Sequence, residues 1–367
     1  MKRDALEVLR ARIFAALAHG DEAQAQNGIA ELQAYEPAEA AGLRTALHIE
    51  AGRADEAFAA WQQRAALAPD DPYTIFLRAR IHVMENERIC ALALLAPLLQ
   101  QRLPAAVAEK AYNLAGQCAR FLGRAAEAVH YYAQARDAAE ELSLRALNAS
   151  NVLFNRHYLP ASLAEDRRAA EEYGALFADV RPFTHEKHNR SGERRLRIGY
   201  LSPDVREHVV LSFSHALMTA LDPACFEVFV YAMNRADSFT EKVRNTVDVF
   251  RNLSQLSAEE AARSIYRDGI DILVDLAGHT AGRTLPILAY RPAPIQISGI
   301  GYFASTGLPT ADYFLADPVL AAGNAAAGFT EKLLVLPHSH FCWQPLHPAP
   351  VPAHAPAAGR SIVFGSF

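Results

Sequence analysis

The sequence predicts a protein of two parts, a helical repeat region up to about residue 150 and an α/β region from Arg195 onward. The first part is rich in Ala and Leu and has almost no runs of β-branched residues, which favours helices. In the second part, short runs rich in Val, Ile and Phe alternate with helix-like segments. Such alternation is typical of a mostly parallel sheet covered by helices on both faces.

The helical part contains an internal repeat. The block Gly-Arg-Ala-Asp-Glu-Ala at 52–57 matches Gly-Arg-Ala-Ala-Glu-Ala at 123–128, and weaker copies begin at Gly20 and Asn86. The steps between the four copies are 32, 34 and 37 residues, close to the ~34-residue helix-turn-helix period of the tetratricopeptide repeat. We therefore predict about four degenerate repeats between residues 5 and 145.

Residues at the consensus positions of this repeat support the prediction. Ala57 and Ala128 occupy the small position of the second helix, and Trp61 and Tyr132 lie at the bulky position four residues later. Gly116 takes the small position of a first helix, where paired helices approach closely. An Ala-rich helical bundle without true repeats is the alternative. The repeats could bind an acceptor protein, form a dimer or buttress the next domain.

The α/β part contains six predicted strands, at 196–201, 226–232, 272–276, 295–301, 313–316 and 332–336. Residues 257–268 form a predicted helix, because Ser257 can cap the first turn and the acidic side chains of Glu259 and Glu260 favour its N-terminus. In parallel sheets, ligands bind beyond the carboxyl ends of the strands. The loops that follow the strands are therefore the candidate site.

Three polar loops follow predicted strands. The first ends at His208, the second is centred on His279, and the third runs from 302 to 307. Imidazole can accept a proton or a hydrogen bond near pH 7, and Gly allows close approach of the backbone to a ligand. A single histidine is more often structural, and the glycines can equally serve turns. The sequence lacks the Gly-rich motifs of dinucleotide and P-loop sites.

Composition argues against several classes of function. A net charge of −5 gives no support for a nucleic-acid partner. The four cysteines are scattered, without a C-x-x-C pair or a histidine at ligand spacing, so neither a zinc site nor a disulfide framework is expected. The N-terminal stretch is charged and no apolar run reaches roughly 18 residues. These features predict no secretory signal, no membrane partner and a cytoplasmic protein.

The longest motifs resemble one known family. They are similar, in order and spacing, to the first catalytic lobe of the O-GlcNAc transferase family. The motifs are RLRIGYLSPDVREH (195–208), FEVFVYAMN (226–234), DGIDILVDLAGHT (268–280), RPAPIQISGIGYFASTGLPTADYFLADP (291–318) and EKLLVLPHSHF (331–341). The upstream repeats match the family's domain order. The resemblance implies a tetratricopeptide-like helical solenoid followed by the first Rossmann-like lobe of a GT-B glycosyltransferase.

The resemblance also implies an activity and a set of site residues. Members of the family transfer a sugar, usually N-acetylglucosamine, from a UDP donor to a Ser or Thr hydroxyl, with inversion and without a metal ion or other cofactor. His208 matches the active-site histidine, which acts as a base or as an orienting group. The acceptor-side residues would be Asp204, Gly278, His279 and Thr280. The residues near the sugar would be Ile300, Gly301, Tyr302, Phe303, Ser305 and Thr306.

Partners and domains follow from the same resemblance. The repeats would hold an acceptor protein, a second lobe would hold the UDP-sugar, and self-association stays open. The expected domains are repeats at 1–150, a helical connector and linker at 151–194, the first catalytic lobe at 195–345, and a linker with the first strand of a missing second lobe at 346–367. The chain as given is expected to be an incomplete, inactive fragment. A non-catalytic binding module with a degenerate lobe is the alternative.

One departure from the family pattern affects the donor. Many members read Gly-Tyr-Pro-Gly-Thr-Ser-Gly where this chain reads Gly-Tyr-Phe-Ala-Ser-Thr-Gly at 301–307. The bulkier Phe303 replaces a Pro beside the sugar, so the donor can be a different sugar.

Overall fold

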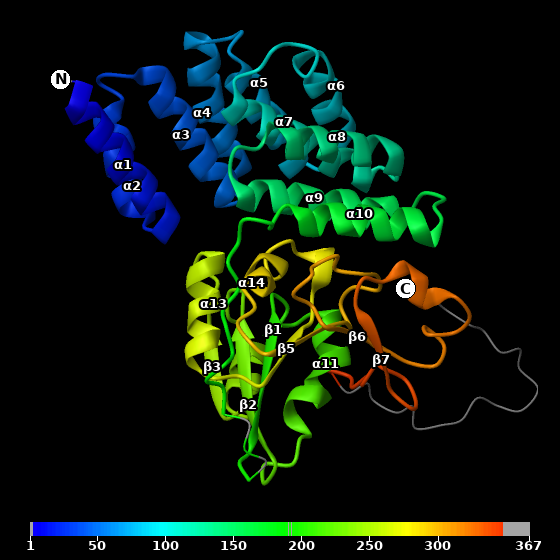
Figure 1. Ribbon diagram of the computed structural model, residues 1–367. Coiled ribbons are helices and arrows are strands. Elements are labelled where there is room, and N and C mark those ends of the chain that lie inside the picture. Colours follow the sequence, from blue (N-terminus) through cyan, green and yellow to red (C-terminus); the bar gives the residue numbers. More distant parts are fainter. Residues whose placement is uncertain (1–2, 190, 192, 348–367) are drawn as a thin grey trace, which may run out of the picture.

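The computed structural model describes residues 3–189, 191 and 193–347, and it has the two parts that the sequence predicts (Figure 1). Ten α-helices come first in the described chain, and a seven-stranded sheet with its covering helices follows. The fold class, a helical solenoid followed by a parallel α/β lobe, is confirmed. The helices of the first part are α1 (Arg3–His19), α2 (Glu22–Leu32), α3 (Pro37–Glu50), α4 (Ala54–Leu67), α5 (Pro72–Met84), α6 (Arg88–Leu98), α7 (Ala105–Phe121), α8 (Ala125–Ala138), α9 (Leu142–Arg156) and α10 (Leu163–Ala175).

The repeated block of the sequence corresponds to the turn inside each helix pair. Its first residue is Gly20, Gly52, Asn86 and Gly123 in the four copies, and each has a positive φ, 72° for the glycines and 64° for Asn86. These turns separate α1 from α2, α3 from α4, α5 from α6 and α7 from α8. Gly and Asn are the residues that adopt the left-handed conformation most easily. The period in the sequence is therefore the period of the turns.

Side-chain size sets how closely paired helices approach. A Cβ atom added to Gly116 on α7 would lie 2.8 Å from the ring of Tyr132 on α8, closer than packed atoms allow. Tyr132 is itself 1% exposed and Ala128 is fully buried. The small and bulky positions that the repeat pattern assigned thus face each other between α7 and α8.

The sheet of the second part is entirely parallel, in the order β3-β2-β1-β4-β5-β6-β7. Its strands are β1 (Leu196–Ser202), β2 (Phe226–Ala232), β3 (Val249–Asn252), β4 (Ile272–Asp275), β5 (Ile295–Ser298), β6 (Tyr313–Ala316) and β7 (Lys332–Val335). Strand β3 was missed by the sequence analysis, because this short edge strand is only half-buried and has no apolar run. Strand β5 ends at Ser298, three residues earlier than predicted.

Helices cover both faces of the sheet. On one face, α11 (Val209–Thr219) and α12 (Ser238–Arg244) bury Leu211 and Phe239 against β1 and β2. On the other face lie α13 (Ala258–Arg267) and α14 (Leu285–Ala289). Helix α13 begins with a capping box between Ser257, its predicted N-cap, and Glu260, one of the acidic residues predicted in its first turn.

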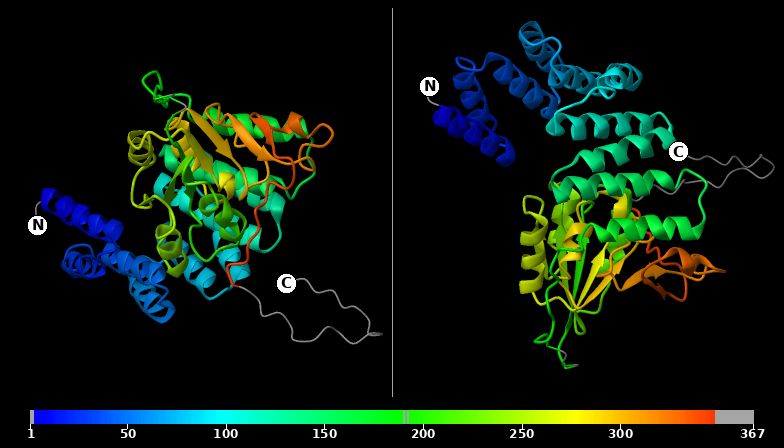
Figure 2. Two further views of the ribbon diagram at one scale, coloured as in Figure 1. Left: turned by 90° about the horizontal axis from the view of Figure 1, so that it is seen from below. Right: turned by 45° about the horizontal axis from the view of Figure 1, so that its top comes forward.

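Helices α9 and α10 lie between the solenoid and the sheet (Figures 1 and 2). Leu153 of α9 and Tyr173 of α10 belong to the same buried cluster as Leu273 of β4 and Leu288 of α14. The helical part and the α/β part thus pack against each other through an apolar interface. The predicted first strand of a second lobe, at 360–367, and most of the connector before it lie outside the described residues. No helix within the described ranges is both long and apolar enough to span a membrane.

Candidate active site

The first candidate loop runs from the end of β1 to the start of α11. The backbone amide of Asp204 donates to Ser202 Oγ (3.0 Å), and the Asp204 carboxylate is nearly buried. His208 is the N-cap of α11, and its side chain is 33% exposed. The amide of Val210 donates to His208 Nδ1 (3.3 Å), so a neutral ring carries its hydrogen on Nε2. Asp204 Oδ1 lies 3.5 Å from the same Nδ1, too far for a strong hydrogen bond.

The second candidate loop, after β4, is shaped by a buried carboxylate. Asp275 accepts hydrogen bonds from the amides of Ala277 (3.2 Å) and Gly278 (2.9 Å) and from Ser298 Oγ (2.7 Å). Complete burial raises the pKa of Asp275, while these donors act in the opposite direction. Thr280, an exposed residue of this loop, donates its hydroxyl to the Ala277 carbonyl (2.7 Å). Asp275 therefore holds the turn that carries the predicted acceptor-side residues.

His279 is buried and both of its ring nitrogens have protein partners. Nε2 donates to the Thr306 carbonyl (3.1 Å), and Nδ1 accepts from Ser150 Oγ of α9 (2.9 Å). The ring also meets Tyr173 and Tyr302 edge-on, at centroid distances of 4.5 and 5.1 Å. Burial lowers its pKa to about 3, so the ring is neutral near pH 7. His279 joins three segments in this structure and presents no ring nitrogen to a ligand.

The loops after β4 and β5 interlock through two glycines. A Cβ atom on Gly278 would lie 2.6 Å from Tyr302 Cβ, and one on Gly301 would lie 2.2 Å from the Leu276 carbonyl oxygen. Both glycines are needed for this close approach. Their role in the structure is backbone packing at the edge where the strands end.

Ile300 has a φ of 71°. A left-handed conformation is a genuine outlier for a β-branched residue and costs about 1–3 kcal/mol. Such strain persists only where the surroundings impose it, and it clusters at functional sites. Its position just after β5, beside Gly301, places this strained turn within the candidate site.

The helical region contributes a side chain that sequence reasoning missed. His157, directly after α9, lies with Nε2 2.6 Å from the hydroxyl of Tyr302. Its ring centroid is 4.9 Å from that of Phe303, which is 58% exposed. Burial lowers the pKa of His157. Nothing in the sequence near His157 indicates this contact, because it joins residues 145 positions apart.

Ser305 and Thr306, predicted near the sugar, are buried and bonded to Glu331. Both hydroxyls donate to the Glu331 carboxylate, and the Thr306 amide donates to it as well (2.7 Å). The three residues are between 0% and 6% exposed. In this structure the two hydroxyls anchor the loop after β5 to the start of β7. Of the predicted residues, Thr280 and Phe303 are exposed, and His208, Ile300 and Gly301 are partly exposed.

A helical solenoid fused to a parallel sheet with polar loops at its carboxyl edge defines a class of ligand-binding α/β proteins. Residues 175–347 match the model described as glycosyl transferase family 41. The α/β lobe of this chain is therefore similar to that family.

Named relatives agree with this similarity. The chain is 36% identical over 206 residues to a probable UDP-N-acetylglucosamine–peptide N-acetylglucosaminyltransferase SPINDLY of Solanum lycopersicum, covering 54% of this chain and 22% of that protein. It is 38% identical over 151 residues to a UDP-N-acetylglucosamine–peptide N-acetylglucosaminyltransferase of Caenorhabditis elegans, covering 40% and 13%. The chain thus spans about a fifth or less of the length of these curated relatives.

A solved structure shows the same fold. A mutant of the Thermobaculum terrenum O-GlcNAc transferase superposes with a TM-score of 0.61 and 24% identity, over 97% of this chain and 62% of that chain. At this identity the likeness concerns the fold, which includes both the solenoid and the lobe.

Proposed function

We propose that this chain is the solenoid and acceptor-side lobe of a protein O-glycosyltransferase. The enzyme would transfer a sugar from a UDP-sugar to a Ser or Thr hydroxyl of an acceptor protein. N-acetylglucosamine is the sugar that we propose. The observation that carries the proposal is the family 41 match over 175–347, the segment that contains His208 and the interlocked loops. A second lobe would bind the UDP moiety, as GT-B enzymes require two lobes.

His208 is proposed to orient the acceptor hydroxyl rather than to remove its proton. Since Val210 donates to Nδ1, Nε2 carries the hydrogen in the neutral ring and faces a ligand as a donor. A donor at this position can bond to the acceptor oxygen or to a phosphate oxygen of the departing diphosphate. The acceptor oxygen would form the bond to the sugar as the bond to UDP breaks, and its proton would pass to a phosphate oxygen of the departing UDP or to solvent. The partly exposed position of His208 at the carboxyl edge of β1 supports direct contact with substrate.

Three further properties are proposed: the metal requirement, the part that binds the acceptor, and the location of the protein. We propose that transfer needs no metal ion, as the resemblance of the motifs to the O-GlcNAc transferase family implies. The solenoid would hold the acceptor protein, in accord with the use of helical repeats as extended binding surfaces. All four cysteines are free thiols, which supports a reducing, cytoplasmic location.

The test is a transfer assay on the longest product of the coding region that contains this chain. UDP binding is measured by calorimetry, and transfer from UDP-N-acetylglucosamine to a mixture of Ser- and Thr-containing peptides is followed by mass spectrometry, with EDTA present. UDP binding with hexosamine transfer that resists EDTA would support the proposal. UDP binding with transfer of another sugar would revise only the donor. Loss of both would favour a non-catalytic binding module.

A further inference from the structure

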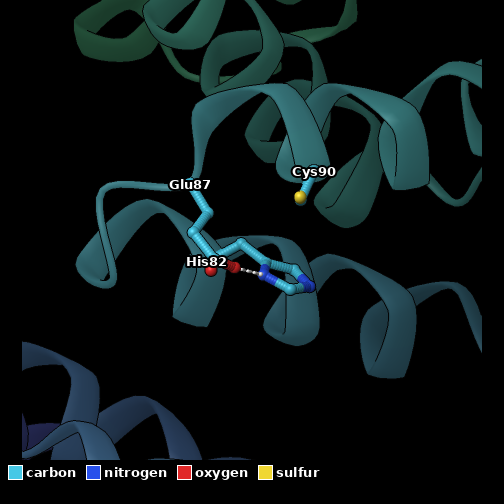
Figure 3. A group of neighbouring side chains, drawn as sticks. All are labelled: His82, Glu87 and Cys90. Atoms are coloured by element: carbon cyan, nitrogen blue, oxygen red, sulfur yellow. Dashed lines mark hydrogen bonds and ion pairs between the residues drawn. The ribbon is translucent and has the colours of Figure 1, made fainter.

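Three metal-ligating side chains of different chemistry converge in the turn between α5 and α6. They are His82, Glu87 and Cys90, and their ligand atoms all lie within 4.8 Å of one another (Figure 3). This turn belongs to the third helix pair of the solenoid and lies away from the sheet (Figure 1). The group is therefore separate from the candidate active site, and the inference does not depend on the proposed function.

The backbone brings the three residues together. Helix α5 ends at Met84, and Asn86 reverses the chain with a φ of 64°. The Glu87 amide then donates to the His82 carbonyl (2.7 Å), which fixes the last turn of α5 against the first turn of α6. Glu87 is the N-cap of α6, so Cys90 lies one turn into the helix, on the same side.

The side chains are already arranged around a common point. His82 Nδ1 lies 2.7 Å from Glu87 Oε2, and the His82 side chain is only 14% exposed, so the imidazole is held in place. Cys90 is an exposed free thiol, open to an incoming ion. Figure 3 shows the thiol and the Glu87 carboxylate on the same side of the turn as the His82 ring. The carboxylate of Glu85, 3.6 Å from His82 Nδ1, adds negative charge to the same place.

We propose that His82, Glu87 and Cys90 bind one zinc-class divalent cation. Imidazole nitrogen, thiolate sulfur and carboxylate oxygen are the three ligand types of protein zinc sites. A thiolate in the first turn of α6 is favoured by the positive end of the helix dipole. Three protein ligands leave a fourth position for water, which is the open form of a zinc site. The ion would join α5 to α6 in the solenoid.

The sequence did not reveal this site because its spacing is H-x4-E-x2-C. This spacing contains neither a C-x-x-C pair nor a second histidine, and these are the patterns by which zinc sites are recognised in a sequence. The left-handed turn at Asn86 is what brings the three positions together. The competing interpretation is that His82 and Glu87 bind no ion and only form a hydrogen-bonded pair at the end of α5.

The experiment is a metal titration of the purified, reduced and metal-free chain. Zn²⁺ is titrated against a chromophoric chelator, and Co²⁺ is added separately because a Co²⁺–thiolate bond gives a near-ultraviolet charge-transfer band. We expect one ion per chain with that band, and weaker binding at lower pH because the thiol and imidazole must lose their protons. Cys90→Ser and His82→Gln should each lower the Zn²⁺ affinity at least about tenfold. A loss of about tenfold is already found when a residue that only hydrogen-bonds to a metal ligand is replaced.

Cys225→Ser is the matched control, since Cys225 is also an exposed free thiol but lies in the loop before β2. It should leave stoichiometry, affinity and the Co²⁺ band unchanged. Circular dichroism of the metal-free variants checks that each is folded. Absence of binding by the unmodified chain, or equal binding by Cys90→Ser, would overturn the proposal and leave His82 and Glu87 as a helix-end pair only.

Discussion

Ser150 of α9 donates its hydroxyl to His279 Nδ1 at 2.9 Å, and this bond joins the helical region to the loop after β4. Both residues are at most 1% exposed. The solenoid and the candidate active site therefore meet through a buried polar contact as well as through apolar packing.

Ser150→Ala should destabilise the chain, because it leaves the buried Nδ1 of His279 without its donor. The expected loss in free energy of unfolding is about 1–3 kcal/mol, measured by urea denaturation. Ser143→Ala on the same helix is the matched control, since Ser143 is exposed and its hydroxyl bonds to the nearby Glu141. It should change stability by less than about 0.5 kcal/mol. Equal effects of the two substitutions would show that the buried bond contributes little.

Gly307→Ala should lower the midpoint of thermal unfolding far more than Gly123→Ala does. Both glycines have nearly the same φ, 74° and 72°. The conformational cost of an added Cβ is therefore the same at both positions, about 1–2 kcal/mol. The Cβ at 307 would lie 1.8 Å from the Ala170 carbonyl oxygen on α10, whereas nothing lies within 4 Å of one at 123. The difference between the two midpoints of thermal unfolding measures the close packing of α10 on the loop. Similar midpoints would mean that α10 moves away at little cost.

The stability of the chain should fall as the pH drops from about 6.5 toward 3. The pKa of His279 is near 6.5 when unfolded and is lowered to about 3 by burial, so between these values the unfolded state binds one more proton. The free energy of unfolding therefore rises with pH across this window by up to about 1.4 kcal/mol per unit from this group. In His279→Gln the slope between pH 4 and 6 should be smaller. An unchanged slope would show that His279 is not held neutral.

His208→Ala in the longer, transferase-active protein should lower turnover about 10²-fold or more, the usual cost of losing one well-placed donor to the reacting atoms. UDP binding should remain nearly intact, because the UDP site is proposed to lie in the second lobe. His208→Gln, which keeps an N–H donor, should recover part of the activity if the residue orients its partner. Calorimetry and initial rates separate these outcomes. An equal loss of UDP binding and turnover would contradict the assignment.

Much of the architecture could be predicted because it depends on local patterns. The turns at Gly20, Gly52 and Gly123 repeat because the left-handed conformation favours Gly, and the helix after Ser257 is predictable from its N-cap hydroxyl and first-turn carboxylates. The edge strand β3 was missed because its short, half-exposed segment has no periodic signal. Asp275 had a signal that was not used, a carboxylate at the end of an apolar strand.

The sequence by itself determined the helical period, the parallel α/β pattern and the family motifs, since these depend on residue type and spacing along the chain. The tertiary structure decided which motif residues remain accessible. His279, Ser305 and Thr306 lie in polar motifs, yet each is bonded to a partner from another segment. Those partners are Ser150 and Glu331, and the contact of His157 with Tyr302 is of the same kind. Burial and hydrogen bonding between distant segments arise only when the chain folds, so no local pattern can encode them.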